Sequence, residues 1–303
     1  MSLKKINNLM NQNKNSRNKF FKLNKYAKNI SSQYGEDGII EYLTKTSSLR
    51  INKSCVEFGA HDGIANSNTY NLWKNKNYSA LLIEADKNRF NNLVKNVEKN
   101  ANVVAVNKFV GFKGDYTLEN IIESTNIFEK NNIGVLSIDI DSCDYFIFKY
   151  LKIKPQIIVI EFNNSIPGYI DYNDPEDQVF LRCSAKSIQN LGFEKGYITV
   201  ACTITNVILI RNDCYNSEKH PYLPVEYLMD YENMSKNNDR LYSIIHSQLI
   251  TTYPISTKPL NFLDKFYLHL TRRLYSIFGI RIEKFIKPNA STKSNLDKSG
   301  LFY

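Results

Sequence analysis

Short apolar runs alternate with segments of helical periodicity through the middle of the chain. Five runs have the length and apolar content of buried strands: 54–58 (SCVEF), 79–84 (SALLIE), 102–106 (NVVAV), 135–140 (VLSIDI) and 156–162 (QIIVIEF). Helical patterns lie between them near 67–75, 87–99, 117–125 and 144–151, with another near 178–191. Near-continuous apolar strands that alternate with helices predict a parallel sheet covered by helices on both faces.

Two further apolar runs close this pattern, 197–202 (YITVAC) and 205–211 (TNVILIR). Only two residues separate them, so they can pair only as an antiparallel hairpin. Five parallel strands with a closing hairpin resemble the layout of the class I methyltransferase sheet, and an ordinary dinucleotide-binding sheet lacks the hairpin. We therefore expect an α/β, Rossmann-like fold with a mostly parallel seven-stranded sheet and a C-terminal antiparallel hairpin.

The chain is predicted to divide into three parts: a basic flexible lead-in at 1–30, the sheet domain at 31–213, and an irregular or helical extension at 214–303. Within the extension, 262–278 places an apolar stripe on one helical face, flanked by lysines and arginines. Such a helix packs on its own domain, pairs two subunits as a homodimer, or attaches a protein peripherally to the inner face of an anionic membrane. These three alternatives stay open.

Charge and cysteine usage narrow the class of protein. The formal net charge of +9 comes from the two ends of the chain, and the middle is mildly acidic. A basic average alone would suggest nucleic acid, but with this distribution we expect no nucleic-acid partner. The five cysteines form no CxxC pair, and no apolar run has the length of a signal peptide or a membrane span. These features predict a cytoplasmic protein with reduced thiols.

The turn after the first predicted strand, VEFGAHDG, is the first candidate binding element. Gly59 and Gly63 allow a sharp turn and a close approach of backbone to a ligand. A phosphate-binding loop would carry lysine and no acids, and a dinucleotide fingerprint needs a third glycine. A carboxylate such as Glu57 instead suits the ammonium and sulfonium of S-adenosylmethionine. The alternative is that Glu57 bonds to backbone amides inside a tight turn.

A second acid supports a nucleoside site. Glu84 ends the predicted strand SALLIE within the motif ALLIEAD, 21 residues beyond Gly63. Sheets of this kind place an acid there to accept both ribose hydroxyls, for NAD as well as for S-adenosylmethionine. Gln33, which precedes a predicted helix, and His61, inside the turn, are further candidate donor contacts. Asp86 is predicted to cap the next helix.

A third group of acids lies at the ends of the fourth and fifth predicted strands. Strand alternation in LSIDIDSCDYFIF would send Asp139 and Asp141 to the same side, and Glu161 lies near the end of IIVIEFN. These carboxylates are candidate catalytic groups, either as a base for an acceptor hydroxyl or as ligands of a divalent cation. The sequence does not require the cation. Alternatively, Asp141 or Ser142 caps the helix near 144–151.

Taken in order, SQYGEDGIIEYL, CVEFGAHDG, ALLIEAD, TLENII, VLSIDIDSCDYFIF and IIVIEFNNSIP resemble the FkbM-like class I methyltransferases of bacterial surface-polysaccharide and glycan biosynthesis. The resemblance covers about 31–213. It implies O-methylation of a sugar or a glycan intermediate, with S-adenosylmethionine as the donor. By this resemblance Glu57, Gly59, Gly63 and Glu84 fall at donor positions, and Asp139 and Asp141 at the reaction rim. Related sequences usually carry glycine where Ser142 stands, which leaves the acceptor open.

Two other functions remain as alternatives to methyl transfer. One is a nicotinamide-dependent oxidoreductase that modifies sugars, because NAD would use Glu84 in the same way. The other is a non-catalytic module that retains a nucleoside pocket.

Overall fold

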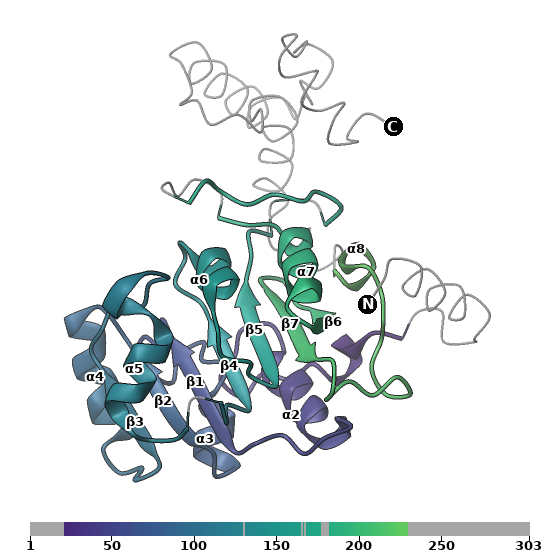
Figure 1. The fold of residues 1–303 in the computed structure, drawn as a ribbon. Helices are drawn as coiled ribbons and strands as arrows, with labels where there is room; N and C mark the ends of the chain where they lie inside the picture. The colour runs from purple at the N-terminus through teal and green to yellow at the C-terminus, as the bar shows by residue number, and fades with distance from the viewer. Residues whose placement is uncertain (1–20, 130, 165, 167, 177–181, 230–303) are drawn as a thin grey trace, which may run out of the picture.

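The computed structural model describes residues 21–229, apart from 130, 165, 167 and 177–181. In this part of the chain one sheet runs in the order β3-β2-β1-β4-β5-β7-β6 (Figure 1). The strands are β1 Ser54–Phe58, β2 Ser79–Ile83, β3 Val103–Val106, β4 Val135–Ile138, β5 Ile157–Glu161, β6 Tyr197–Cys202 and β7 Asn206–Arg211. The first five pair in parallel, and β7 lies antiparallel between β5 and β6.

This strand order confirms the predicted fold class. The sheet is α/β and Rossmann-like, with five parallel strands and a closing antiparallel hairpin. Each predicted strand is present, with ends that differ by no more than two residues. The largest difference is in β4, which ends at Ile138 rather than at 140.

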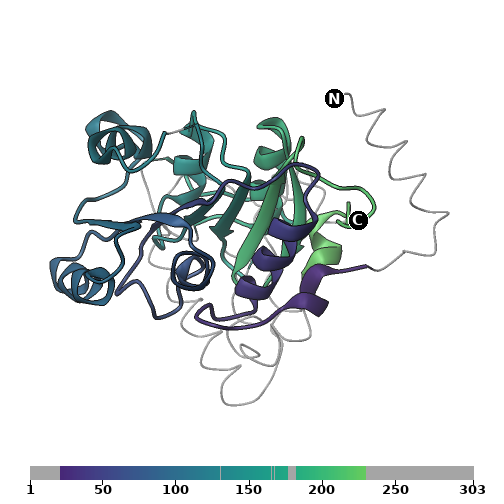
Figure 2. The same cartoon turned by 90° about the horizontal axis from the view of Figure 1, so that it is seen from below.

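Helices cover both faces of the sheet, as Figures 1 and 2 show. They are η1 Leu23–Tyr26, α2 Glu36–Thr46, α3 Tyr70–Asn75, α4 Lys87–Val97, η2 Gly114–Tyr116, α5 Leu118–Thr125, α6 Asp144–Tyr150, α7 Ala185–Glu194 and α8 Val225–Leu228. One apolar cluster joins the sheet to α5, α6, α7 and α8, and the other joins it to η1, α2, α3 and α4.

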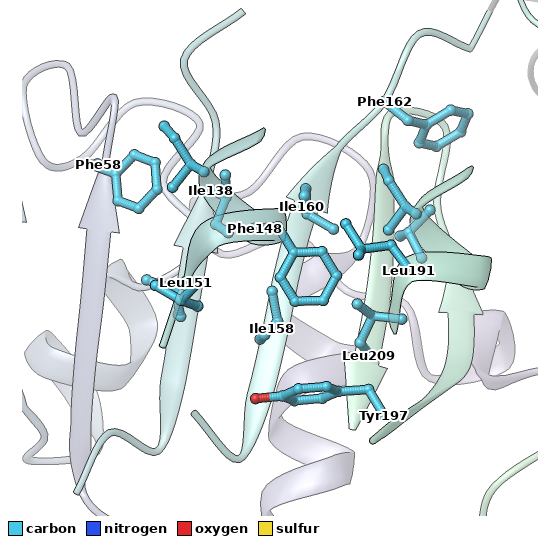
Figure 3. Close-up of a cluster of buried hydrophobic side chains, with 14 of the residues drawn as sticks. Phe58, Ile138, Phe148, Leu151, Ile158, Ile160, Phe162, Leu191, Tyr197 and Leu209 are labelled. Carbon is cyan, nitrogen blue, oxygen red and sulfur yellow. The ribbon is translucent and has the colours of Figure 1, made fainter. Parts of the chain in front are cut away.

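The strand residues alternate between these two clusters. Ile158 and Ile160 of β5 face α6 and α7, where Phe148 and Tyr197 also pack (Figure 3), and Ile157 faces the opposite layer. A strand whose two faces are both buried needs apolar residues at every position, which explains the continuous runs in the sequence. Packing from both sides fixes the carboxyl ends of β1, β2, β4 and β5 at one edge.

The packed body is longer at both ends than 31–213. Leu23 is fully buried, and the ring of Tyr26 stacks on Tyr42 with 3.8 Å between centroids. Leu23 and Tyr26 therefore pack on the domain within the lead-in predicted at 1–30, and the bounds of the three predicted parts stay a prediction. On the other side, Cys214 and Leu228 are buried in the core.

The predicted amphipathic helix at 262–278 lies outside the described residues, and its three alternatives stay predictions. Of the helices in residues 21–229, none is both long and apolar enough to cross a membrane.

Candidate active site

A cavity of about 380 Å³ opens at the carboxyl edge of the sheet, where open α/β sheets bind their ligands. Its lining includes eight of the nine predicted site residues: Gln33, Glu57, Gly59, His61, Glu84, Asp139, Asp141 and Glu161. Gly63 is the exception. The structure therefore brings the predicted donor residues and the predicted rim carboxylates together in one cavity.

The two glycines of the first turn serve the packing of the chain. Gly59 has φ 74°, and a Cβ at this position would lie 1.7 Å from the backbone oxygen of Asp139. Gly63 has φ 79°, and its Cβ would lie 2.6 Å from Cδ1 of Leu93 on α4. Gly59 thus lets the loops after β1 and β4 approach each other, and Gly63 lets α4 pack. A contact between Gly63 and the donor stays a prediction.

Glu57 bonds inward, to the segment that follows the turn. Its carboxylate accepts hydrogen bonds from Ser67 Oγ at 2.5 Å, Asn68 N at 2.8 Å and Thr69 Oγ1 at 2.6 Å. Burial raises the pKa of this carboxyl, and the bonds from Ser67 and Thr69 oppose that rise. This is the alternative that the sequence left open, in which Glu57 braces the turn. A contact between Glu57 and the donor stays a prediction.

Glu84 stands at the end of β2 and joins the first turn to the start of α4. Its Oε2 accepts from the backbone N–H of His61 and its Oε1 from that of Asp86, both at 2.8 Å. Asp86 caps α4 as predicted, because its side chain accepts from Asn88 N and Arg89 N. Each oxygen of a carboxylate has a second lone pair, so Glu84 can still accept from a ligand in the cavity.

The loop that carries Gln33 is held by Asp37, a residue that the sequence did not single out. Oδ2 of Asp37 accepts from the backbone N–H groups of Ile30, Ser31 and Ser32, each at 2.8 Å. Asp37 is buried at the start of α2. A short acidic residue that accepts several backbone donors is typical of such turns, but the sequence does not reveal which loop it closes.

The rim carboxylates converge for a reason that differs from the predicted one. Because β4 ends at Ile138, Asp139 and Asp141 lie in the following loop, and Asp141 has φ 57°. Buried Asp144 shapes this loop by accepting from Ile140 N at 2.9 Å and Ser142 N at 3.0 Å. The prediction that strand alternation directs Asp139 and Asp141 to one side is therefore wrong. The predicted cap is also wrong, since the residue before α6 is Cys143, without a side-chain cap.

Oxygen atoms of Asp139, Asp141 and Glu161 all lie within 4.8 Å of one another. Burial and the nearby charges of Asp144 and Asp141 together raise the pKa of Asp139 to about 7. Burial and the charge of Asp139 raise the pKa of Glu161 to about 9, against the opposing effect of Arg182. Carboxyls with such values can exchange protons near neutral pH.

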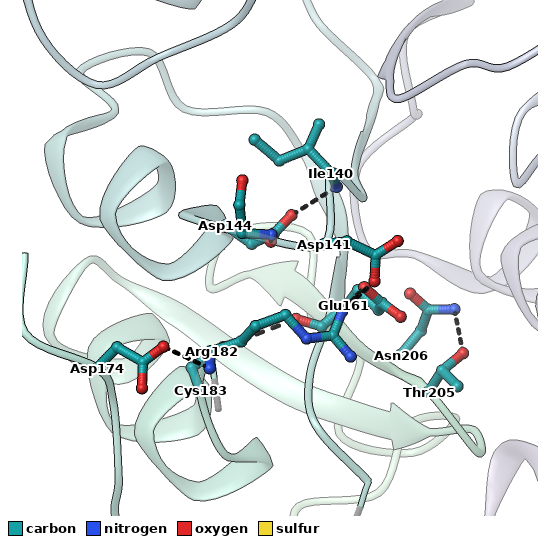
Figure 4. Close-up of polar contacts among 10 residues, drawn as sticks. Ile140, Asp141, Asp144, Glu161, Asp174, Arg182, Cys183, Thr205 and Asn206 are labelled. Carbon is teal, nitrogen blue, oxygen red and sulfur yellow. Dashed lines mark hydrogen bonds and ion pairs between the residues drawn. The ribbon is translucent and has the colours of Figure 1, made fainter. Parts of the chain in front are cut away.

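Arg182 is the site residue that the sequence analysis missed. Its Nη1 donates to Oδ1 of Asp141 at 2.7 Å and also to Oε2 of Glu161 (Figure 4). Arg182 lies 21 residues beyond Glu161, inside the helix predicted near 178–191, whereas α7 begins only at Ala185. No signal in the sequence connects the two.

The sheet order places this chain in the class I methyltransferase fold. No family model matches the sequence, and no curated protein matches it. Among solved structures, a SAM-dependent methyltransferase from Aquifex aeolicus is 12% identical, with a TM-score of 0.33 over 58% of this chain and 88% of that one.

Two other solved structures give similar values. TrmK of M. capricolum, in complex with S-adenosyl-homocysteine, is 12% identical with a TM-score of 0.39, over 86% of this chain and 97% of that one. The N-terminal domain of EvdMO1, in the presence of SAH and D-fucose, is 12% identical with a TM-score of 0.37, over 60% and 84%. Similarities of this size say nothing about what this chain binds.

Proposed function

We propose that this protein is an S-adenosylmethionine-dependent O-methyltransferase whose acceptor is a sugar or a glycan intermediate. One observation carries the proposal. A single cavity joins an acid at the end of β2, Glu84, to the carboxylates after β4 and β5, Asp139 and Glu161. In a class I methyltransferase sheet, the first position suits the ribose of the donor and the second faces the transferred methyl group.

The acidic first turn of the cavity suits a nucleoside without phosphates. The remaining lone pairs of Glu84 can accept from the two ribose hydroxyls, which is the use of an acid at this position in nucleoside-binding sheets. The first turn offers no lysine to neutralise a pyrophosphate. Gln33 lies at the same cavity and can contact the amino-acid end of the donor.

The rim supplies a base for oxygen methylation. In the proposed step the acceptor oxygen attacks the methyl carbon, the bond from carbon to sulfur breaks, and the hydroxyl proton passes to Asp139. A base with a pKa near the working pH is the most effective, and the value of about 7 for Asp139 meets this condition. The rest of the rate comes from alignment of the two substrates.

The sugar acceptor rests on the resemblance of the ordered motifs from SQYGEDGIIEYL to IIVIEFNNSIP to FkbM-like enzymes. Within this proposal, Asp141 and Glu161 lie on the side of the cavity where the acceptor would approach.

The proposal is tested first by a thermal-shift panel with S-adenosylmethionine, S-adenosylhomocysteine, NAD and NADP. A ligand at about 100 times its dissociation constant stabilises the folded state by about 2.7 kcal/mol, so binding is readily detected. We expect both S-adenosyl compounds to raise the Tm and both nicotinamides to leave it unchanged. Stabilisation by NAD or NADP instead would favour the oxidoreductase.

Methyl transfer from labelled donor to a panel of free sugars, nucleotide sugars and lipid-linked saccharides is the second test. A labelled sugar ether is the expected product. Donor binding without transfer to any member of the panel would favour the non-catalytic module.

A further inference from the structure

One nitrogen of Arg182 holds two of the three rim carboxylates. Nη1 bonds both to Asp141 and to Glu161, and the guanidinium therefore lies among the same oxygens that are close enough to share a cation. The side chain of Arg182 is only 21% exposed. Burial acts to lower the pKa of Arg182, but the charges of Glu161 and Asp141 outweigh this effect and raise it. The guanidinium of Arg182 therefore stays positively charged beside Asp141 and Glu161.

The segment before α7 is built to deliver this side chain. Residues 172–174 pair with 182–184: Asp174 N donates to Arg182 O and Ser184 N to Tyr172 O, both at 2.8 Å. The backbone of Arg182 has φ 65°, a left-handed conformation that is uncommon for a side chain of this size. Oδ2 of buried Asp174 accepts the N–H of Arg182 at 2.6 Å and stabilises this conformation (Figure 4). Unfavourable backbone held in place by its surroundings is typical of functional sites.

We propose that Arg182 is a positioning residue that supplies, from the chain itself, the cation that Asp139, Asp141 and Glu161 would otherwise take from a bound metal ion. Three carboxylates at this spacing suit a hard divalent cation, which binds oxygen at about 2.0–2.6 Å. With Nη1 bonded to Asp141 and to Glu161, a metal ion bridging the same oxygens would have to displace the guanidinium. The site as folded therefore does not fit a resident metal.

The contacts of Arg182 also give the three carboxylates different roles. Among the described residues, Arg182 pairs with Asp141 and Glu161, and no arginine pairs with Asp139. This consequence rests on the proposed function, because it assigns the acceptor proton to Asp139. The statement about the cation does not rest on it, because metal binding is measured without any substrate.

The experiment is a titration with Mn²⁺, followed by electron paramagnetic resonance and calorimetry. Arg182→Gly removes the guanidinium and suits the left-handed backbone, and Arg182→Gln is a second variant that keeps a polar side chain. Arg182→Lys retains a cation. Arg211→Gln is the matched control. It removes the same charge, and Arg211 pairs with exposed Asp213 at the end of β7 that lies beside the start of β5, away from the carboxyl edge of the sheet.

We expect no saturable Mn²⁺ site in the wild type, in Arg182→Lys or in Arg211→Gln, and one submillimolar site in Arg182→Gly and Arg182→Gln. Adding Glu161→Gln to Arg182→Gly should remove that site. A merely structural arginine would not make metal binding depend on the charge at position 182.

Two results would overturn the proposal. One is saturable Mn²⁺ binding by the wild type that Glu161→Gln removes, which would make the rim a metal centre. The other is a folded Arg182→Gly that binds no more Mn²⁺ than Arg211→Gln. Neither result depends on donor binding, so failure of the proposed methyl transfer would be recognised separately in the thermal-shift panel.

Discussion

The two halves of the cavity use carboxylates in different ways. At the ends of β1 and β2, Glu57 and Glu84 accept hydrogen bonds from neighbouring backbone and hydroxyl groups of the same chain. After β4 and at the end of β5, Asp139, Asp141 and Glu161 lie close to one another, and Arg182 pairs with Asp141 and Glu161. In the donor half, Glu57 and Glu84 therefore hold neighbouring segments of the chain by hydrogen bonds. At the rim, by contrast, the negative charges of the carboxylates are only partly compensated.

This difference between the two halves of the cavity suggests that one half serves mainly to bind the donor and the other to transfer protons. A buried carboxylate whose acceptor sites are filled stabilises the fold and changes little during a reaction. Carboxyls whose pKa values are raised by burial and by each other can take up and release protons near neutral pH. Substitutions in the two halves should consequently affect different measurements, and the predictions below use that contrast.

The largest effect is expected for Asp139→Asn. The amide keeps the shape of the side chain but cannot accept the acceptor proton, so turnover should fall by about a hundredfold or more. Donor affinity, measured by calorimetry with S-adenosylhomocysteine, should stay near the wild-type value. Asp115→Asn, at an exposed position, is the matched control. Normal turnover of Asp139→Asn with the true acceptor would exclude Asp139 as the base.

In the other half, Glu57→Ala should act mainly on stability. The substitution leaves Ser67, Asn68 and Thr69 without their buried acceptor, and each lost partner costs about 1–3 kcal/mol. We expect a loss of at least about 2 kcal/mol in the free energy of unfolding, measured with urea. Glu57→Gln, which can keep part of this bonding, should lose less. Equal stability of Glu57→Ala and the wild type would show that the turn does not depend on this carboxylate.

The pH dependence of kcat/KM should reflect the protonation state of Asp139 at the rim. Burial raises the pKa of Asp139 to about 7, so below that pH the group is protonated and cannot act as a base. Because the ionised form is the active one, kcat/KM should fall by about tenfold for each pH unit below 7 and level off above it. Asp139 and Glu161 interact, so the measured value belongs to the pair. A profile that is flat between pH 5 and 8 would contradict this assignment.

The sequence predicted the fold better than the site. Strands such as 54–58 and 197–202 agree with the structure to the residue, because continuous apolar runs are required wherever both faces of a sheet are buried. The end of β4 was not predictable in this way. Asp139 follows an unbroken strand pattern, and the departure of the backbone depends on Asp144, which accepts bonds from the loop only after folding.

The role of Glu57 and the presence of Arg182 depend on contacts between segments distant in sequence. Whether a carboxylate at a strand end faces a ligand or an internal hydroxyl is decided by the position of Ser67 and Thr69, which periodicity does not fix. Arg182 reaches the rim only because 172–174 pair with 182–184. Local pattern predicts elements, but it does not predict which irregular segments meet over a cavity.

Glu84→Ala tests the one acid of the donor half that is expected to bind the ligand as well as the chain. Loss of two hydrogen bonds to a charged acceptor should weaken donor binding by about tenfold or more, measured by calorimetry with S-adenosylhomocysteine. Glu98→Ala removes the same charge from an exposed position and should leave the affinity unchanged. Unchanged donor affinity in a folded Glu84→Ala variant would show that the ribose does not bind at Glu84.

The smallest effect is expected for His61→Ala. The contribution of His61 to the donor half is its backbone N–H, which donates to Glu84, and its side chain is 47% exposed. Alanine keeps that N–H, although the left-handed backbone at φ 52° suits alanine less well than histidine, so the Tm of the variant is measured alongside. Donor affinity should therefore change by less than about threefold, within what loss of a partly exposed contact allows. Calorimetry with S-adenosylhomocysteine checks this. A tenfold loss would mean that the imidazole itself binds the donor.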